Sequence, residues 1–134
     1  MKQKLSNQDI AYLVTSLNEL LDGSYLVQIY DGSEKDTRTL IFKLRKKLDD
    51  ESNVYYLLFE SGKRIHTIDE FVSVRKNPSG CVSKLRKELG KRRLFPINQI
   101  GNDRIIDLQF SNDRHLILEL YDKGNIILTD ENYN

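Results

Sequence analysis

The segment from Gln99 to Asp130 has the most regular alternation of apolar and polar residues in the chain, so it constrains the fold most. Three apolar runs, over residues 105–110, 116–121 and 126–128, are separated by polar clusters rich in Gly, Asn and Asp. Short runs with a period of two, broken by turn-forming residues, are typical of neighbouring antiparallel strands. We therefore predict a three-stranded antiparallel meander over this segment.

The earlier part of the chain mixes helical and strand-like patterns. Apolar residues three and four positions apart predict a helix over residues 10–21, with Ser6 and Asp9 placed to form a capping box at its start. A second, shorter helix is predicted over residues 81–89, with Cys81 or the next residue on its apolar face. Further strands are predicted over residues 25–30, 39–44, 54–59, 64–67 and 94–100. Pro96 makes the last of these an edge or bulged strand, because proline has no backbone N–H to donate.

Length and composition limit the class of protein. The chain has 134 residues, a length typical of one domain with one hydrophobic core. Its 21 basic and 20 acidic residues nearly cancel, so any nucleic-acid surface must be a local patch. The lone Cys81 cannot form an internal disulfide, and no apolar run approaches the roughly 18 residues of a membrane span. We expect a single-domain cytoplasmic or nuclear protein that does not enter a membrane.

Motifs for catalysis, metal binding or cofactor binding are missing from the sequence. His66 and His115 lie far apart, and neither has a second His or Cys at metal-ligand spacing. Nucleophile-elbow, phosphate-loop and dinucleotide-binding patterns do not occur either. Nearby cations favour a lowered pKa for Cys81, whereas its place in a helix favours burial in the core. We therefore expect no catalytic centre, metal or cofactor, and structural roles for both histidines.

The strongest positive signal is a group of cations in and after the second predicted helix. Within ten residues only Glu88 opposes the basic side chains. We call this group the basic cluster, and its members are Lys84, Arg86, Lys87, Lys91, Arg92 and Arg93. Such a cluster is either a solvated helix surface or a phosphate-binding surface whose affinity depends on salt. Stacking faces for RNA bases could come from Tyr12, Tyr55, Tyr56 and Phe95, although aromatic residues in strands usually belong to the core.

Asp103 and Arg104 form a charged pair at the head of the predicted meander. Consecutive residues of a strand point to opposite faces, so the two side chains would not simply pair with each other. The pair is either an edge salt bridge or a binding site, in which Arg offers a planar donor group and Asp accepts from a base. Asp9 has the same two interpretations, as a helix cap or as part of a site.

Several longer motifs resemble one protein family. The strings RRLFPINQIGNDRIIDLQF and HLILELYDKGNIILTD carry the resemblance, MKQKLSNQDI resembles the opening of the family, and ESGKRIHT and KLRKELGKRRL fit its middle blocks. On these motifs residues 1–134 are similar to the N-terminal domain of the NFACT family, most of all to eukaryotic members. Full-length members continue into a helix-hairpin-helix domain, a coiled coil and a further RNA-binding domain. The resemblance therefore implies an excised domain or a reduced protein.

The resemblance implies a function in ribosome-associated quality control. Family members bind an obstructed large ribosomal subunit and recruit aminoacylated tRNA for template-free, C-terminal elongation of the stalled chain. Eukaryotic members also help a ubiquitin ligase to dock. An acid in the opening helix and an Asp-Arg pair are required in the family, and they match Asp9, Asp103 and Arg104 here.

The resemblance also implies a fold. The family domain is similar to the N-terminal domain of formamidopyrimidine-type DNA glycosylases, which is a two-layered β-sandwich with flanking helices. We therefore predict the α+β class, with antiparallel sheets packed as a sandwich. Those glycosylases begin with a Pro-Glu pair, whereas this chain begins MKQ, so glycosylase activity is not expected.

Together these observations predict a non-catalytic RNA-binding module that positions tRNA. The basic cluster would contact phosphates, and Asp9, Asp103 and Arg104 would form a discriminating pocket in a cleft flanked by those cations. Two alternatives remain open. One is a protein-interaction module that docks to neighbouring domains or to a ubiquitin ligase, and the other is a glycosylase-like enzyme.

Overall fold

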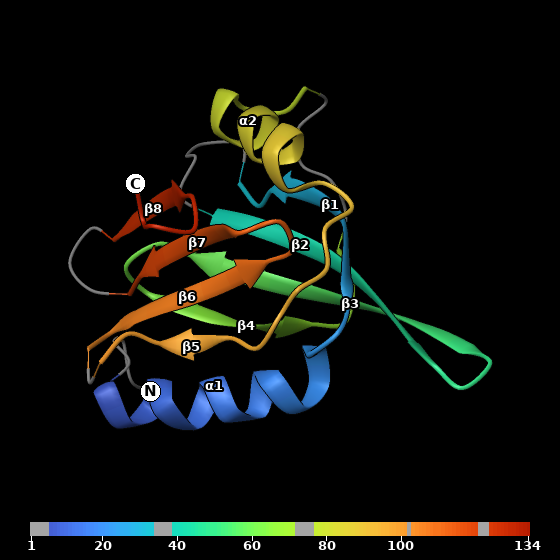
Figure 1. Cartoon of the computed structure of the whole chain (residues 1–134), viewed down its shortest axis with the longest axis horizontal. Coiled ribbons are helices and arrows are strands. Elements are labelled where there is room, and N and C mark those ends of the chain that lie inside the picture. The colour runs from blue at the N-terminus through green and yellow to red at the C-terminus, as the bar shows by residue number, and fades with distance from the viewer. Residues whose placement is uncertain (1–5, 34–38, 72–76, 102, 121–123) are drawn as a thin grey trace.

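The computed structural model describes residues 6–33, 39–71, 77–101, 103–120 and 124–134, which contain two helices and eight strands. The elements follow one another as α1 (Asn7–Leu21), β1 (Tyr25–Asp31), β2 (Thr39–Leu48), β3 (Glu51–Glu60), β4 (Arg64–Ile68), α2 (Gly80–Leu89), β5 (Asn98–Gln99), β6 (Ile105–Phe110), β7 (Arg114–Glu119) and β8 (Asn125–Thr129). Figure 1 shows α1 at one end of the molecule and α2 at the other, with the strands between them.

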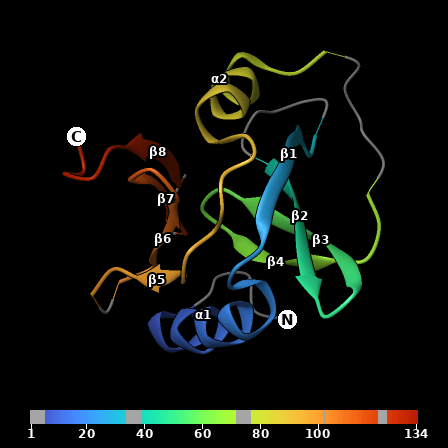
Figure 2. The same cartoon turned by 45° about the vertical axis from the view of Figure 1, so that its right-hand side comes forward.

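The strands form two four-stranded antiparallel sheets, each with its strands in sequence order. The first sheet contains β1 to β4 and the second contains β5 to β8. The sheets face each other, as Figure 2 shows, and their inner faces share one hydrophobic core with both helices. Phe42 and Phe59 from the first sheet and Phe110 from the second are almost completely buried in that core. The predicted α+β class, with antiparallel sheets and flanking helices, is confirmed.

The predicted meander is confirmed as β6, β7 and β8. Its register places Leu108 opposite Leu116, and Leu116 opposite Leu128, so apolar residues line the inner face of the sheet. Side chains alternate between the two faces of a strand, so a strand with one buried face shows alternating apolar and polar residues in its sequence. The polar break between β6 and β7 is a turn, in which Asn112 and Asp113 adopt positive φ angles of 62° and 59°. The second predicted break lies largely outside the described residues.

The predicted strand over residues 94–100 is wrong for most of its length, because only Asn98 and Gln99 form a strand. The N–H of Ile97 donates to Asn18 Oδ1 over 2.6 Å, and Asn18 Nδ2 donates to the Ile97 carbonyl over 2.7 Å. These bonds tie Ile97 to α1, whereas Leu94 and Phe95 keep only isolated contacts with β6. Pro96 has no N–H to offer a strand partner.

The β2–β3 hairpin is longer than predicted and projects from the body of the molecule (Figure 1). Ten residues of each strand pair, from Thr39 with Glu60 to Leu48 with Glu51. The charged residues after Leu44 continue the strand because cross-strand hydrogen bonds satisfy their backbone while their side chains reach solvent. The predicted location of this charge run near a hairpin tip is correct, and Asp49 in the turn has φ +56°.

Both helices begin with the caps that their sequences suggest. In α1 the Asp9 N–H donates to Ser6 Oγ over 3.1 Å, and the Ser6 N–H donates to Asp9 Oδ2 over 2.9 Å. This is the predicted capping box. In α2 the cap is Ser79, whose Oγ donates to buried Asp31 Oδ1 over 2.6 Å and accepts from the N–H of Val82, the third residue of the helix.

The apolar face of α2 contains Val82, Leu85 and Leu89, all of which are buried. Cys81 is exposed, so its predicted place in the core is wrong. Its helical position turns it away from the face that packs on the sheets. The pKa of the thiol is raised, first by desolvation and then by the negative charge of Asp31, and Lys84 opposes the shift. The expected lowering of this pKa by nearby cations is therefore also wrong.

Candidate functional site

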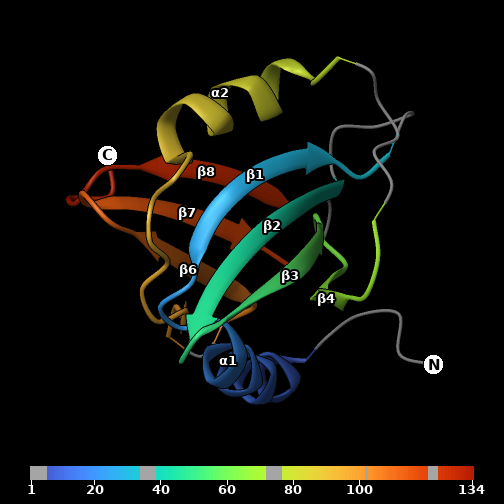
Figure 3. The ribbon, with the colours of Figure 1, turned by 90° about the vertical axis from the view of Figure 1, so that its right-hand side faces the viewer.

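The residues predicted to form one site are divided between two ends of the molecule. Figures 1 and 3 show that α2, with its part of the basic cluster, lies at the opposite end from α1. Asp9 is in the first turn of α1. The expected cleft, with Asp9 flanked by the cations of α2, is therefore not formed, because the two sheets stand between the helices.

Asp9 lines a pocket of about 440 Å³ between α1 and the edge strand β4. The other lining residues are Tyr12, Leu13, Ser16, Arg64, Ile65 and His66. Sequence reasoning did not select the residues from β4, because no local pattern reveals that this edge strand faces α1. The helical spacing of residues 9, 12, 13 and 16 on one face was the available signal.

The pocket has an apolar floor and a polar rim. Ile65 is almost completely buried beneath it, whereas Tyr12 is 79% exposed beside it. His66 Nδ1 lies 3.1 Å from the Thr67 carbonyl oxygen, which can only accept, so Nδ1 carries the proton and Nε2 of the neutral ring is an acceptor. Arg64 Nε lies 2.9 Å from a Glu60 carboxylate oxygen, which holds the guanidinium at the rim. This arrangement suits a small planar group with an apolar face and a polar edge.

Asp103 and Arg104 lie in the turn between β5 and β6, not in a strand. Because they are not strand residues, the prediction that their side chains point to opposite faces of a strand is wrong. The Arg104 N–H donates to Asp103 Oδ1 over 2.8 Å, and Gln99 Nε2 donates to the Asp103 carbonyl over 2.7 Å. The Leu120 N–H donates to the Arg104 carbonyl over 2.8 Å. Contacts from both neighbouring segments thus define the conformation of this turn, and Asp103 remains exposed.

Asp9 and the β5–β6 turn lie at the same end of the molecule. In Figures 1 and 2 the first turns of α1 are next to the end of the second sheet where β5 leads into β6. Asp103 and Arg104 do not line the pocket that contains Asp9. The structure therefore places the three predicted recognition residues at the same end of the molecule, with Asp9 in a pocket and Asp103 and Arg104 in a turn outside the lining of that pocket.

Two members of the basic cluster, Arg86 and Arg92, make hydrogen bonds that stabilise the fold. Arg86 Nε donates to the Ile29 carbonyl over 2.8 Å, and its guanidinium carbon lies 5.5 Å from the centre of the Tyr30 ring. This side chain therefore connects α2 to β1. The Arg86 guanidinium is therefore partly turned towards the protein, and its cation–π contact with the Tyr30 ring also stabilises the packing of α2 on β1.

Arg92 has a comparable structural role after the end of α2. Its Nε donates to the Glu88 carbonyl over 2.6 Å, and its Nη1 donates to the Ser111 carbonyl over 2.9 Å. The Arg92 side chain therefore joins α2 to the β6–β7 turn. The carboxylate of Glu88 lies 3.9 Å from Arg114 Nε, so the single acid of this region has a partner outside the basic cluster.

The remaining four cations of the basic cluster are exposed. Lys84, Lys87, Lys91 and Arg93 show no side-chain hydrogen bond or ion pair with any described residue. Lys91 has φ +66° and ends the helical run, so it does not continue the stripe formed by Lys84 and Lys87. Lysine and arginine side chains without acidic partners are available for phosphate oxygens.

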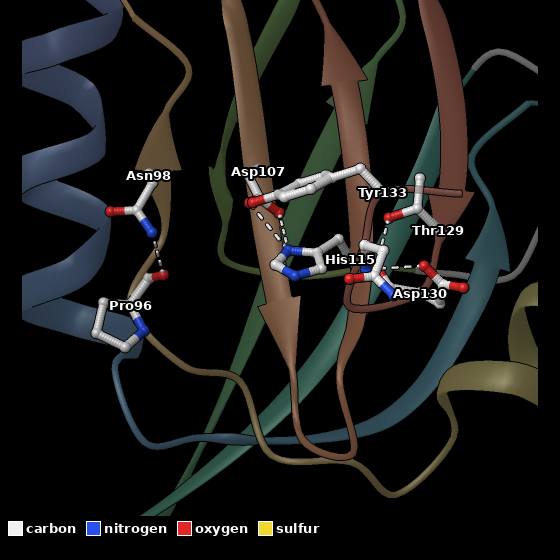
Figure 4. A network of polar contacts seen from close by, with 8 residues as sticks. Pro96, Asn98, Asp107, His115, Thr129, Asp130 and Tyr133 are labelled. Atoms are coloured by element: carbon white, nitrogen blue, oxygen red, sulfur yellow. Dashed lines mark hydrogen bonds and ion pairs between the residues drawn. The ribbon is translucent and has the colours of Figure 1, made fainter.

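A polar network on the outer face of the second sheet is a separate feature (Figure 4). His115 Nδ1 lies 2.9 Å from both carboxylate oxygens of Asp107, and both side chains are buried. The Tyr133 hydroxyl donates to Asp107 Oδ2 over 3.0 Å, and its ring lies 4.5 Å from the His115 ring. This network anchors the last residues to β6 and β7, so His115 has the structural role that the sequence indicated.

Other kinds of site are not found in the part of the chain that the structure describes. Its His, Cys, Asp and Glu side chains form no group of three that could hold a metal ion. Neither described helix is long and apolar enough to cross a membrane.

Solved structures with the same fold come from streptococcal proteins. The N-terminal domain of the fibronectin-binding protein PavA from Streptococcus pneumoniae matches with a TM-score of 0.80 and 25% identity, over 94% of this chain and 51% of that one. The N-terminal part of the fibronectin/fibrinogen-binding protein from Streptococcus suis matches with a TM-score of 0.78 and 24% identity, over 90% of this chain and 47% of that one. The expected similarity to DNA glycosylases stays a prediction.

Sequence relatives extend over nearly the whole chain. The ribosome quality control complex subunit NEMF of Homo sapiens is 41% identical over 136 residues, covering 99% of this chain and 12% of that protein. Ribosome quality control complex subunit 2 of Saccharomyces cerevisiae is 37% identical over 133 residues, covering 98% of this chain and 12% of that protein. The chain thus spans about an eighth of the length of these relatives. The model of the NFACT N-terminal and middle domains matches residues 7–134, and the chain belongs to the NFACT family.

Proposed function

We propose that this chain is an RNA-binding domain of ribosome-associated quality control that positions tRNA on an obstructed large ribosomal subunit in the cytoplasm. The observation that supports this most strongly is its 41% identity, over nearly its whole length, to a ribosome quality control subunit. In this proposal the domain itself carries out no chemical step. It holds tRNA while the stalled nascent chain is extended without a template. A ubiquitin ligase is a further partner in the same pathway.

The proposed division of labour follows the two ends of the molecule. The exposed cations at the α2 end would contact phosphates and supply affinity that depends on salt. The Asp103–Arg104 turn and the Asp9 pocket, at the α1 end, would contact bases and supply choice among tRNAs. Arg86 and Arg92 would contribute through the fold, since their guanidinium groups already donate to backbone carbonyls.

The test is a tRNA titration of the 134-residue chain at two salt concentrations. Lys84→Gln with Lys87→Gln should weaken binding of every tRNA and reduce the salt slope by about one for each cation removed. Asp103→Asn with Arg104→Gln should erase the preference among tRNAs and leave the salt slope less affected. Asparagine at position 103 keeps a side-chain oxygen for the Arg104 N–H, so the fold of the turn is retained.

Two results would contradict the proposal. If the wild-type chain shows no affinity for tRNA at low salt, the domain does not bind tRNA by itself. If the lysine variants leave tRNA binding unchanged while charge reversal of the same residues abolishes capture of a neighbouring domain, the protein-interaction alternative replaces it.

A further inference from the structure

Neither of the two described helices covers the outer face of the first sheet, which lies between α1 and α2 (Figure 3). On β2, Lys43, Arg45 and Lys47 alternate with residues that turn the other way, so all three point to this outer face. The intervening Leu44 is buried in the core, which fixes the direction of the alternation. A row of three cations therefore runs along the strand towards the hairpin tip.

The neighbouring strands add neutral and aromatic side chains to the same face. Cross-strand partners share a face, and β3 places Tyr56 opposite Lys43, Val54 opposite Arg45, and a serine opposite the last cation. On the other side, β1 places Tyr25 opposite Arg45. A register irregularity between residues 26 and 28 of β1 lets Tyr25 lie on the outer face while Leu26 faces the core.

Arg93, after α2, extends this face by one further segment. It forms an isolated antiparallel bridge with Tyr25. The Leu26 N–H donates to the Arg92 carbonyl, and the Leu94 N–H donates to the Ser24 carbonyl, on either side of the bridge. Tyr25 and Arg93 are therefore a non-hydrogen-bonded pair, whose side chains lie close together on one face. Successive cross-strand pairs therefore form one row of side chains across the sheet, which contains Arg93, Tyr25, Arg45 and Val54.

We call these residues the basic sheet face, and its members are Tyr25, Lys43, Arg45, Lys47, Val54, Tyr56 and Arg93. Its four cations show no side-chain hydrogen bond or ion pair with the residues that the structure describes. Their cross-strand partners are neutral. A surface with several cations and no opposing carboxylate favours a polyanion over an ordinary protein partner.

Tyr25 distinguishes the kind of polyanion. Its side chain is 53% exposed although it lies in the middle of a row. Tyr30 and Tyr56 are further along the same sheet and stack against Phe71, with ring centres 5.0 and 6.2 Å away, so their rings are already partnered. An open tyrosine between two arginines matches an unstacked base with phosphates on either side, whereas a duplex would use the cations alone.

We propose that the basic sheet face binds single-stranded RNA, with one base stacked on Tyr25 and the backbone following Lys43, Arg45 and Lys47. Alternate residues of a strand are about 7 Å apart, a spacing that successive phosphates of an extended strand can follow. Arg93 contacts the phosphate on the other side of the stacked base. The inference rests on the proposed function in one respect, since it assigns a further RNA surface to an RNA-binding domain.

The test uses fluorescence anisotropy of the 134-residue chain with an oligouridine of about ten nucleotides and with a fully paired RNA hairpin. Tyr25→Ala should weaken oligouridine binding about tenfold, and Tyr25→Phe should bind like the wild type because the stacking ring remains. Arg45→Gln with Lys47→Gln should weaken it further and lower the salt slope. The control is Lys63→Gln, which removes an exposed cation in the β3–β4 turn outside this face and should leave oligouridine binding nearly unchanged.

Several outcomes would overturn the inference: no oligouridine binding by the wild-type chain, equal binding by Tyr25→Ala and Tyr25→Phe, or equal weakening by the Lys63→Gln control. Circular dichroism of each variant checks that the fold is retained. Tyr25→Phe keeps an aromatic residue at this position of β1, so it is the folded reference for Tyr25→Ala. The failure of this inference is distinguishable from failure of the proposed function. Loss of tRNA preference in the Asp103→Asn with Arg104→Gln variant tests the latter alone.

Discussion

The side chain of Asn18 makes two hydrogen bonds to the backbone of Ile97, one in each direction. These bonds attach the segment before β5 to α1, across 79 positions of sequence. Asn18→Ala would leave the N–H and the carbonyl of Ile97 without those partners. We expect a loss of about 1–3 kcal/mol in the free energy of unfolding, measured by urea denaturation. The neighbouring exposed Glu19→Ala is the control, and an equal loss there would contradict the explanation.

Asp9 caps α1 and also lines a pocket, and mutation can separate these two positions of its carboxylate. Ser6→Ala removes the hydrogen bond from the Asp9 N–H to Ser6 Oγ but leaves the Asp9 carboxylate at the pocket. Asp9→Ala removes that carboxylate, together with the hydrogen bond that it accepts from the Ser6 N–H. Each should lower the free energy of unfolding by about 0.5–2 kcal/mol. If Asp9 contributes to tRNA choice, only Asp9→Ala changes the relative affinities of different tRNAs in a titration. Identical affinities for the two variants would reduce Asp9 to a helix cap.

Arg92 should matter for stability more than its neighbours in the basic cluster. Arg92→Ala removes hydrogen bonds of 2.6 and 2.9 Å to two backbone carbonyls, and we expect it to cost about 1–3 kcal/mol in chemical denaturation. Exposed Lys87→Ala should change stability by less than about 0.5 kcal/mol. A weaker tRNA complex of an Arg92 variant would then reflect a change in the fold and not a lost phosphate contact. Equal stability of both variants would refute the structural role.

Tyr133 should make the stability of the C-terminal residues depend on alkaline pH. The hydrogen bond to Asp107 raises the pKa of Tyr133 above its usual value, and the charge of that carboxylate adds to the shift. A raised pKa means that the stabilisation is complete below about pH 10 and is lost as the pH rises through the folded-state pKa. Because Tyr133 is largely exposed, we expect less than about 1 kcal/mol.

The measurement is the difference in melting temperature between wild type and Tyr133→Phe, which keeps the ring but has no hydroxyl to donate or titrate. The difference should be constant from neutral pH to about pH 9 and disappear above the raised pKa. A difference that stays constant into strongly alkaline solution would show that ionisation of the Tyr133 hydroxyl does not affect stability, and would contradict the prediction.

Local patterns in the sequence were enough to predict the elements whose stability depends on near neighbours. The Ser6–Asp9 capping box and the β6–β8 meander both follow from residues within a few positions of one another. Turn residues and alternating side chains act over such short distances, so they can be recognised without knowing the rest of the fold. The basic cluster was also visible as a run of charges.

The roles of individual charges in that run could not be predicted in the same way. Arg86 and Arg92 donate to carbonyls on β1 and on the β6–β7 turn, and neither partner is near them in sequence. The Asp103–Arg104 pair lies in a turn because Gln99 and Leu120 hold its backbone. Periodicity indicates which face of an element a side chain occupies, but it carries no information about the segment that packs against that face.

By itself the sequence determined the helices, the strand alternation and the membership of the chain in its family, since these depend on local spacing and on ordered motifs. Only the tertiary structure decided that α1 and α2 close opposite ends of the sandwich, that β4 completes the pocket of Asp9, and that Arg93 aligns with Tyr25 and Arg45. These relationships arise from the packing of two sheets around one core, which brings together residues that are dozens of positions apart. Burial of apolar surface drives that packing, and it has no direction that a single segment could reveal.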